Sequence, residues 1–429
     1  MTSDKRKTWL DGVYLGPAAV LDDTDYVKRL RDEIGLNAVV LSYTGELPDE
    51  LMELSPYRGK TPSDSDLEDL ILRHFDGRPV DPLEYDRAKA LCGPGVSATG
   101  DDATFRKAVE QLKELGLETW ICGGAWTIRR LMFCPSNPDV REWMTAVCVH
   151  WGSQYGVEAL DITHFRYPMG SFPLGLFGCT CNHCRSEATT LGYDMDEMVA
   201  GLTDAREKLR KLDGKRLGQV TRLGFGFFDV VHALGLSSGF LDWWRFRQDL
   251  VVKNLKQFKA AVHDASPDTR FGTDTYPASM AMTAGHDYLR WDEMADYASP
   301  LVSHISAFVC NTFIEWARFL QAEVPNLSEA DALQTVYRFL GYDGMGLPET
   351  IETMDVAEPD LAARIPTADL VLRDLVKAKL LLPDGVPSYP IIHGHGWSRE
   401  TIDRIVDEAK ELGHNGIVWQ GTDELVSDK

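Results

Sequence analysis

The chain has 429 residues, of which 44% are hydrophobic and 10% aromatic, so it is long enough to bury a large apolar core. Its formal net charge of −22 argues against nucleic-acid binding, because phosphate groups require a basic face. The charge also argues against an anionic membrane surface as a partner, and no apolar run approaches the roughly 20 residues of a membrane-spanning helix.

Strand-like apolar runs alternate with amphipathic helices from one end of the chain to the other. We expect eight strands, over residues 12–16, 37–43, 118–122, 157–162, 269–273, 302–309, 389–393 and 415–419. We expect helices between them over residues 25–35 and 104–116, from Pro138 onward, and over 243–265. Such an alternation is typical of a parallel sheet with crossover helices.

Eight strands of this kind predict an α/β fold, a (β/α)8 TIM barrel that forms one catalytic domain over residues 1–429. Two insertions are expected, at about 46–100 after the second strand, with a short helix near 64–75, and at about 169–240 after the fourth. A doubly wound open sheet is the alternative, but no Gly-x-Gly-x-x-Gly turn follows any strand. Only ten residues follow position 419, so the eighth helix is expected to be short, missing or replaced, and an open flank there would favour self-association.

Four cysteines form a candidate metal site. Cys179, Cys181 and Cys184 make a C-x-C-x-x-C cluster, and Cys134 stands upstream where a helix should begin. Four thiolates on two loops are typical of structural zinc, which needs no open position for chemistry. Disulfides or unrelated buried thiols are the alternatives, and His183 can replace one cysteine. The N-terminus carries no stretch resembling a signal peptide, so we expect a cytoplasmic protein with reduced thiols.

Two aspartates are candidate catalytic residues at the carboxyl ends of strands, where TIM barrels carry their active sites. Alternation along the fourth strand turns Asp161 inward, and alternation along the fifth turns Asp274 inward. Paired carboxylates can hydrolyse a glycosidic bond, and we expect Asp161 as nucleophile or base and Asp274 as proton donor. A salt bridge from Asp161 to Arg166 and a turn cap at Asp274 are the structural alternatives, and His164 is a third candidate acid or base.

His393 and His395 follow the seventh strand on one side of the chain. They are candidates for hydrogen bonds to substrate hydroxyl groups. The rival hypothesis is a catalytic metal held with an aspartate, in a metal-dependent hydrolase or lyase. Amidohydrolase-type barrels would place such a pair on the first strand, where this chain has Tyr14 and Gly16.

Aromatic side chains also gather at predicted strand ends. The candidates for stacking against sugar rings are Trp126, Tyr276, Trp397 and Trp419. Each one alone is more often a core residue. Arg166 is a further candidate for substrate binding, or it neutralises nearby carboxylates.

The run Phe133-Cys134-Pro135-Ser136-Asn137-Pro138, followed by a helix, a strand and the C-x-C-x-x-C cluster with Arg185, resembles family 42 β-galactosidases and related barrels. The resemblance covers about residues 133–185 and implies a structural zinc beside the active-site mouth. Family 42 enzymes carry Asn-Glu at the end of the fourth strand, where this chain has Asp161-Ile162-Thr163-His164. That segment is closer to uncharacterised hydrolase-like barrels, in which the fourth-strand aspartate resembles a nucleophile or base.

The sequence therefore predicts a cytoplasmic enzyme of carbohydrate metabolism that cleaves a glycosidic bond in a small carbohydrate or oligosaccharide. It would use structural zinc and no organic cofactor. The metal-dependent enzyme and a non-catalytic carbohydrate-binding barrel are the alternative hypotheses.

Overall fold

The computed structural model of the chain describes residues 9–45, 47–48, 50–51, 101–124, 127–128, 131–132, 134–167, 174–394 and 396–421. Most of the insertion expected at 46–100, including its short helix near 64–75, lies outside these residues, and so do residues 422–429, where a last helix was considered.

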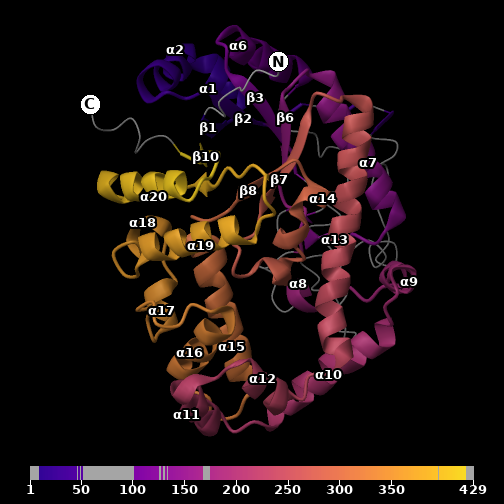
Figure 1. Cartoon of the computed structure of the whole chain (residues 1–429), viewed down its shortest axis with the longest axis vertical. Coiled ribbons are helices and arrows are strands. Elements are labelled where there is room, and N and C mark those ends of the chain that lie inside the picture. The colour runs from indigo at the N-terminus through magenta and orange to yellow at the C-terminus, as the bar shows by residue number, and fades with distance from the viewer. Residues whose placement is uncertain are drawn as a thin grey trace.

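Eight parallel strands form the centre of the described structure (Figure 1). They are β1 (Leu10–Leu15), β2 (Ala38–Ser42), β3 (Glu118–Cys122), β6 (Ala159–Ile162), β7 (Arg270–Thr275), β8 (Tyr297–Pro300), β9 (Ile391–Ile392) and β10 (Gly416–Trp419). Their spatial order is β8-β7-β6-β3-β2-β1-β10-β9, and a parallel bridge between Ala298 and Ser388 joins the two ends of the sheet. The fold is a nearly closed (β/α)8 TIM barrel, as the alternation predicted. A separate antiparallel pair is formed by β4 (Thr127–Ile128) and β5 (Leu131–Met132).

Helices cover the barrel and extend beyond its end (Figure 1). Before β7 they are α1 (Pro17–Asp22), α2 (Thr24–Arg29), the π-helix η1 (Leu30–Ile34), α6 (Asp102–Glu114), α7 (Pro138–Gln154), α8 (Leu174–Phe177), α9 (Asn182–Leu191), α10 (Met195–Lys211), α11 (Gly214–Gly224), α12 (Phe227–Leu234) and α13 (Ser238–Ala265). After β7 they are the short η2 (Ala281–Ala284) and η3 (Tyr288–Arg290), α14 (Trp291–Met294), the π-helix η4 (Ile305–Cys310), α15 (Asn311–Glu323), α16 (Glu329–Leu340), α17 (Ile351–Met354), α18 (Glu358–Leu361), α19 (Thr367–Leu381) and α20 (Arg399–Glu411).

Local sequence signals explain where two of the predicted helices begin and end. Pro138 occupies the first turn of α7, and the Asn137 side chain before it accepts a hydrogen bond from the backbone NH of Asp139 at 2.9 Å. Gly35 ends the first helical segment with φ of 90°, a conformation that glycine adopts without steric cost.

Side chains alternate between two cores, one inside the barrel and one between the strands and the helices. Trp120, Tyr297 and Tyr389 pack against one another inside the barrel, with ring centroids 4.8 to 5.5 Å apart. Gly272 faces the same space, where a Cβ atom would lie 2.2 Å from the Tyr297 ring. A larger residue at position 272 would therefore displace this aromatic packing.

The sixth strand predicted over 302–309 is wrong, because the strand is β8 (Tyr297–Pro300) and 305–310 is helical. Ile305, Val309 and Phe313 recur every four residues and are all buried, which is the spacing of a helix face rather than of a strand. Ser303 lies in the connection, where its hydroxyl donates to the carbonyl of Ile391 at 3.0 Å.

The segment between β6 and β7 contains α8 to α13, and the bounds of 169–240 expected for an insertion there stay a prediction. Helices α10, α11 and α12 lie beyond the barrel at the end where the strands finish, next to α15 and α16 (Figure 1). No helix within the described ranges is long and apolar enough to cross a lipid bilayer. The assignment of the whole chain to one domain stays a prediction.

Candidate active site and metal centre

Asp161 lies at the carboxyl end of β6 and points into the barrel. The hydroxyl of Ser299 donates to its Oδ1 at 3.0 Å, and the hydroxyl of Tyr14 donates to its Oδ2. The side chain is only 1% exposed. Burial and the charge of Asp274 raise the pKa of Asp161 to about 7, against the two hydrogen bonds, which favour the ionised form. A substantial part of Asp161 is therefore protonated near neutral pH.

Asp274, on the neighbouring strand β7, has the opposite electrostatic behaviour. The Thr163 hydroxyl donates to its Oδ2 at 2.8 Å, and the backbone NH of His164 donates to its Oδ1 at 3.1 Å. Burial raises the pKa of Asp274, but the charge of Arg166, the nearby His164 and the Thr163 hydrogen bond outweigh burial and hold the pKa below its ordinary value. Asp274 is therefore an anion at neutral pH.

The register of the two strands fixes the spacing of this pair. Asp161 pairs with Gly272, so Asp274 lies two residues further along the adjacent strand. Strand geometry then places the two Cα atoms about 8 Å apart. Two carboxyl groups whose surroundings push their pKa values in opposite directions are suited to act as acid and base in one reaction.

The loop after β6 supplies the groups that stabilise Asp274. His164 has φ of 67°, a left-handed conformation that is uncommon for a residue with a side chain. Its Nδ1 lies 2.6 Å from Thr163 Oγ1. Because the single Thr163 hydroxyl proton is donated to Asp274, His164 Nδ1 must carry the proton of the other contact. Burial and Arg166 lower the pKa of His164, so this ring is neutral at pH 7.

Arg166 lies in an aromatic enclosure beside these residues. Its guanidinium carbon is 5.0 Å from the centroid of the Tyr276 ring and 5.1 Å from that of Phe308, and the side chain is 3% exposed. Tyr276 is 1% exposed, and burial raises its pKa to about 12. Arg166 and Tyr276, both predicted to bind substrate, are therefore buried near Asp274.

His286 is a site residue for which the sequence analysis made no prediction. Its Nδ1 accepts from the backbone NH of Tyr276 at 3.0 Å, so its Nε2 donates to the carbonyl of Phe165 at 3.1 Å. Burial and the charge of Arg166 lower the pKa of His286 to about 4. The neutral ring therefore joins the loops that follow β6 and β7. In the sequence, only the position of His286 shortly after a predicted strand could have indicated this role.

The remaining predicted histidine and tryptophans lie in different surroundings. The backbone NH of His393 donates to Ser303 Oγ at 2.6 Å, and its ring centroid is 5.7 Å from that of His304. Trp397 and Trp419 are 7% and 5% exposed and belong to the core between strands and helices. Trp126 and His395 lie outside the described residues.

His304 was also missing from the sequence prediction, and it contributes to the same end of the barrel. Its Nε2 donates to Gln420 Oε1 at 2.6 Å, and burial with the nearby His393 lowers the pKa of His304 to about 4. His304 was not predicted as a site residue, because the sequence analysis placed position 304 inside the sixth strand rather than after its end.

The four cysteines converge in one buried cluster, with their Sγ atoms all within 4.8 Å of one another. Cys134 Sγ lies 3.5 Å from Cys181 Sγ and 3.4 Å from Cys184 Sγ, and all four are free thiols rather than disulfides. Four sulfurs bound to zinc at about 2.3 Å stand about 3.8 Å apart, so the cluster fits a tetrahedral ion. His183 is not in the cluster, and no other group of three or more potential ligands occurs in the described part of the chain.

Packing connects the cysteine cluster to the loop that carries the catalytic candidates. The guanidinium carbon of Arg247 lies 3.7 Å from the centroid of the Tyr167 ring. The backbone NH of Tyr167 donates to the Ala284 carbonyl at 2.8 Å. Arg247 donates to the carbonyl of Leu176, three residues before Cys179. Arg247 of α13 therefore contacts both Tyr167, which follows β6, and Leu176, which lies shortly before Cys179.

Comparisons with known proteins add a likeness of fold. No protein-family model matches the sequence, and no curated protein is detectably similar to it. The chain is similar to the glycoside hydrolase domain of PgaB (BpsB) from Bordetella bronchiseptica, with 8% identity and a TM-score of 0.48 over 98% of this chain and 96% of that one.

Two β-galactosidases show a comparable likeness. The enzyme from the Antarctic haloarchaeon Halorubrum lacusprofundi has 12% identity and a TM-score of 0.48, over 96% of this chain and 52% of that one. The enzyme from Bacillus circulans sp. alkalophilus has 11% identity and a TM-score of 0.45, over 98% of this chain and 51% of that one. The chain thus spans about half the length of these β-galactosidases.

Proposed function

We propose that this protein is a glycoside hydrolase in which Asp161 is the proton donor and Asp274 is the nucleophile or base. The observation that carries the proposal is the pair of buried carboxyl groups at adjacent strand ends, with the pKa of Asp161 raised to about 7 and that of Asp274 lowered. This assignment reverses the roles expected from the sequence, where Asp161 was the nucleophile or base.

Asp161 and Asp274 have separate roles in the proposed reaction. Protonated Asp161 gives its proton to the glycosidic oxygen, so the leaving sugar or aglycone departs as an alcohol. Anionic Asp274 attacks the anomeric carbon or removes a proton from the attacking water. The Thr163 hydroxyl and the His164 NH keep Asp274 oriented during this step.

Arg166 is buried beside Asp274, and its charge favours the ionised carboxylate that the proposed reaction needs. His393 lies near the end of β9, where we propose that it contacts the substrate. A small carbohydrate or oligosaccharide remains the substrate class that we propose, and a cytoplasmic location and self-association stay predictions.

The cysteine cluster would hold a structural zinc ion in this proposal. Four thiolate ligands would leave zinc no open position, so the ion would cross-link the loops before α7 and α9 and take no part in proton transfer. The residues of this chain that would bind it are Cys134, Cys179, Cys181 and Cys184.

A screen of aryl glycosides against wild type, Asp161→Asn and Asp274→Asn tests the proposal. We expect hydrolysis of at least one glycoside by wild type and losses of about 10³-fold or more in both variants. Asp296→Asn is the matched control, because it alters a carboxyl that directly precedes β8, at the opposite strand end from Asp161 and Asp274, and that accepts from the backbone NH of Phe271. Unchanged hydrolysis in either site variant would refute the proposal.

The alternative hypotheses predict different results in the same screen. A metal-dependent hydrolase or lyase using His393 and His395 would lose activity on mild chelation while the cysteine-bound metal stays in place. A non-catalytic binding barrel would bind sugars but hydrolyse none of the glycosides.

A further inference from the structure

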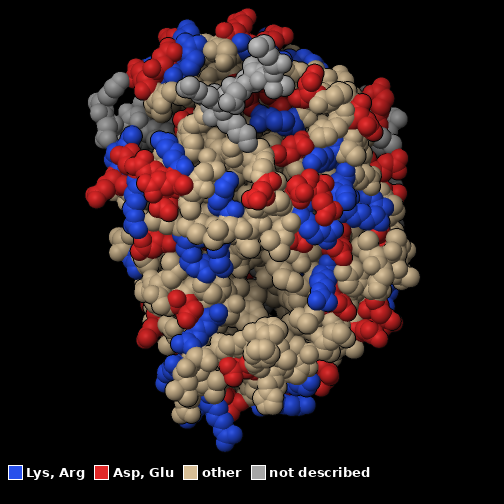
Figure 2. Space-filling model, viewed as in Figure 1, with Lys and Arg blue, Asp and Glu red and all other residues tan. Residues whose placement is uncertain are grey.

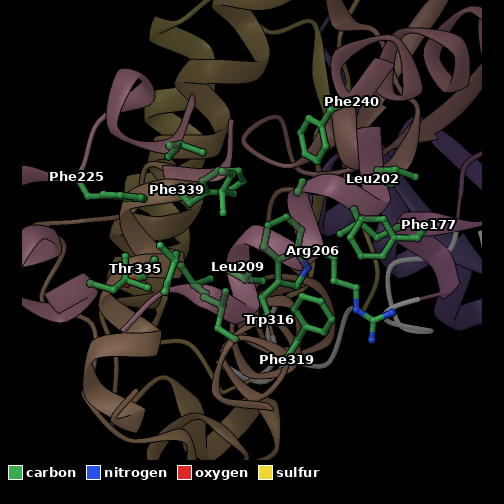
Figure 3. Close-up of a pocket in the computed structure, with 18 of the residues that line it drawn as sticks. Phe177, Leu202, Arg206, Leu209, Phe225, Phe240, Trp316, Phe319, Thr335 and Phe339 are labelled. Atoms are coloured by element: carbon green, nitrogen blue, oxygen red, sulfur yellow. The ribbon is translucent and has the colours of Figure 1, made fainter. Parts of the chain in front are cut away.

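An apolar pocket with a volume of about 160 Å³ lies beyond the barrel, between the helices of the segment from α8 to α13 and helices α15 and α16 (Figure 3). Figure 2 shows the face of the molecule hollowed in its lower half, with mostly uncharged residues around the opening. Two polar side chains of the pocket, Arg206 and Thr335, are bound within the protein, to Glu323 at 2.7 Å and to the carbonyl of Asp331 at 2.8 Å. Its other lining residues are apolar or aromatic. Partners for sugar hydroxyl groups are therefore to be sought at the barrel mouth rather than in this pocket.

Gln420 directly follows β10 and faces the inside of the barrel. Two residues earlier, Val418 belongs to the core inside the barrel, whereas Trp419 belongs to the outer core. Successive side chains of a strand point to opposite faces, so Gln420 shares the inward face with Val418. The backbone NH of Gln420 donates to the carbonyl of Ile392 at 2.9 Å, which continues the pairing of β10 with β9. Gln420 therefore lies beside His393, which follows β9.

The other neighbour of β10 connects Gln420 to the proposed catalytic pair. Strand β10 also pairs with β1, where Trp419 is the register partner of Val13. The next residues along both strands, Gln420 and Tyr14, are therefore neighbours, on strands about 4.8 Å apart. The hydroxyl of Tyr14 donates to Asp161, the proposed proton donor. Gln420 thus belongs to the end of the barrel where the proposed reaction takes place.

His304 holds the amide of Gln420 in one orientation. Because its pKa is about 4, the His304 ring is neutral near pH 7, and its Nε2 donates to Gln420 Oε1 at 2.6 Å. The ring centroid of His304 lies 5.2 Å from that of Phe308 and 5.7 Å from that of His393. With Oε1 engaged, the NH₂ group of Gln420 points away from His304, and it donates to no residue in the described part of the chain. Gln420 is partly exposed, so this NH₂ group is available to a ligand at the barrel mouth.

We propose that Gln420 binds a hydroxyl group of the sugar substrate by donating its amide NH₂, and that His304 is the positioning residue that holds the amide in this orientation. This role of Gln420 rests on the proposed glycosidase function and makes Gln420 a determinant of substrate choice. A sugar that lacks the facing hydroxyl would cover the NH₂ group and leave it without an acceptor, and an unpaired buried donor costs free energy. Sugars that carry the hydroxyl are preferred for this reason.

Removing one hydroxyl at a time from the substrate tests the role of Gln420. The probes are the nitrophenyl glycoside that wild type hydrolyses best and its derivatives that each lack one ring hydroxyl. For wild type, we expect the loss of one particular hydroxyl to lower kcat/KM about 30-fold. Gln420→Met should lower kcat/KM about 30-fold on the complete sugar and lose nothing further when that hydroxyl is removed. Gln257→Met is the matched control and should behave as wild type, because Gln257 is exposed on α13 and its amide donates to Thr145 at 3.0 Å.

A fluorine atom in place of the same hydroxyl tests the orientation of the amide. Fluorine accepts a weak hydrogen bond but donates none, so wild type should lose less activity on the fluoro sugar than on the deoxy sugar. His304→Phe keeps an aromatic ring beside Phe308 but cannot donate to Gln420. We expect this variant to reduce the penalty for the missing hydroxyl from about 30-fold to about fivefold. The pH–rate profiles of both variants should keep the wild-type shape, because neither change removes a proposed catalytic carboxyl.

The outcomes separate this role from the glycosidase proposal. Equal penalties in wild type and Gln420→Met for every missing hydroxyl would overturn the role of Gln420 and leave the glycosidase proposal intact. A fluoro sugar hydrolysed as slowly as the deoxy sugar would overturn the orientation held by His304. If wild type hydrolysed no glycoside, both proposals would fall. If Gln420→Met does not fold, Gln420→Asn makes the same comparison with a shortened side chain.

Discussion

The raised pKa of Asp161 predicts how the stability of the protein depends on pH. In the fold this carboxyl has a pKa of about 7, against the ordinary aspartate value of 3.8. The fold therefore keeps Asp161 protonated in a range of pH where the unfolded chain ionises it. Raising the pH through this range favours the unfolded state, so the stabilising effect is complete below pH 3.8 and is lost as the pH rises to about 7.

The size of the effect follows from the two pKa values. Their difference corresponds to about 4 kcal/mol, because each pKa unit is worth about 1.4 kcal/mol. Asp161→Asn has no proton to exchange at this position. The free energy of unfolding of wild type, minus that of Asp161→Asn, should therefore fall by about 4 kcal/mol between pH 4 and pH 7 and stay constant above.

Urea denaturation of both proteins at intervals of half a pH unit measures this difference. Asp101→Asn is the control, because hydrogen bonds from Thr104 lower the pKa of Asp101, so its own contribution to stability is lost only as the pH falls below the ordinary aspartate value. Above pH 5 its difference from wild type should be flat. A flat or rising difference for Asp161→Asn would refute the assignment of a protonated Asp161.

Three further predictions concern the groups around the two carboxylates and the cysteines. Tyr14→Phe removes a hydrogen bond that favours ionised Asp161, so the basic limb of the pH–rate profile should move up by about one pH unit. Arg166→Gln removes the cation that holds the pKa of the second carboxylate low, so the acidic limb should move up in the same measurement. Cys134→Ser should release the bound metal and cost about 4 kcal/mol of stability, whereas Cys148→Ser, at a buried thiol outside the cluster, should keep the metal content measured by mass spectrometry.

Much of the site follows from patterns that are local in the sequence. Alternation along two strands turns Asp161 and Asp274 to the same interior, because successive side chains of a strand point to opposite faces. The cysteine cluster could be predicted for a similar reason. Cys134 precedes the helix at Pro138, and the C-x-C-x-x-C cluster follows the next strand, so a parallel barrel brings them to one end.

The partners of Asp161 could not be predicted in this way. Ser299 reaches it from β8, which the sequence analysis placed several residues too late. Tyr14 reaches it across the barrel from β1, a contact that depends on closure of the sheet rather than on local pattern. These contacts and the burial determine the pKa of Asp161, and the sequence alone does not show them. The sequence analysis therefore gave the two aspartates the opposite roles to those now proposed.

The backbone conformation of His164, after β6, also could not be predicted from the local sequence. His164 takes a left-handed backbone conformation, and its NH donates to Asp274. Histidine has only a weak preference for this region, so tertiary contacts decide it. Aromatic residues are equally ambiguous, because Trp419 belongs to the outer core although it ends a strand.

The central claim is that Asp161 protonates the leaving group, and the dependence of hydrolysis on the leaving group tests it most directly. Wild type and Asp161→Asn are compared on two glycosides of one sugar, with dinitrophenol and with an alkyl alcohol as leaving groups. Dinitrophenol departs without a proton, so the variant should keep most of the wild-type rate on that glycoside and lose about 10³-fold on the alkyl glycoside. Equal losses on both glycosides would contradict the role of Asp161 as proton donor.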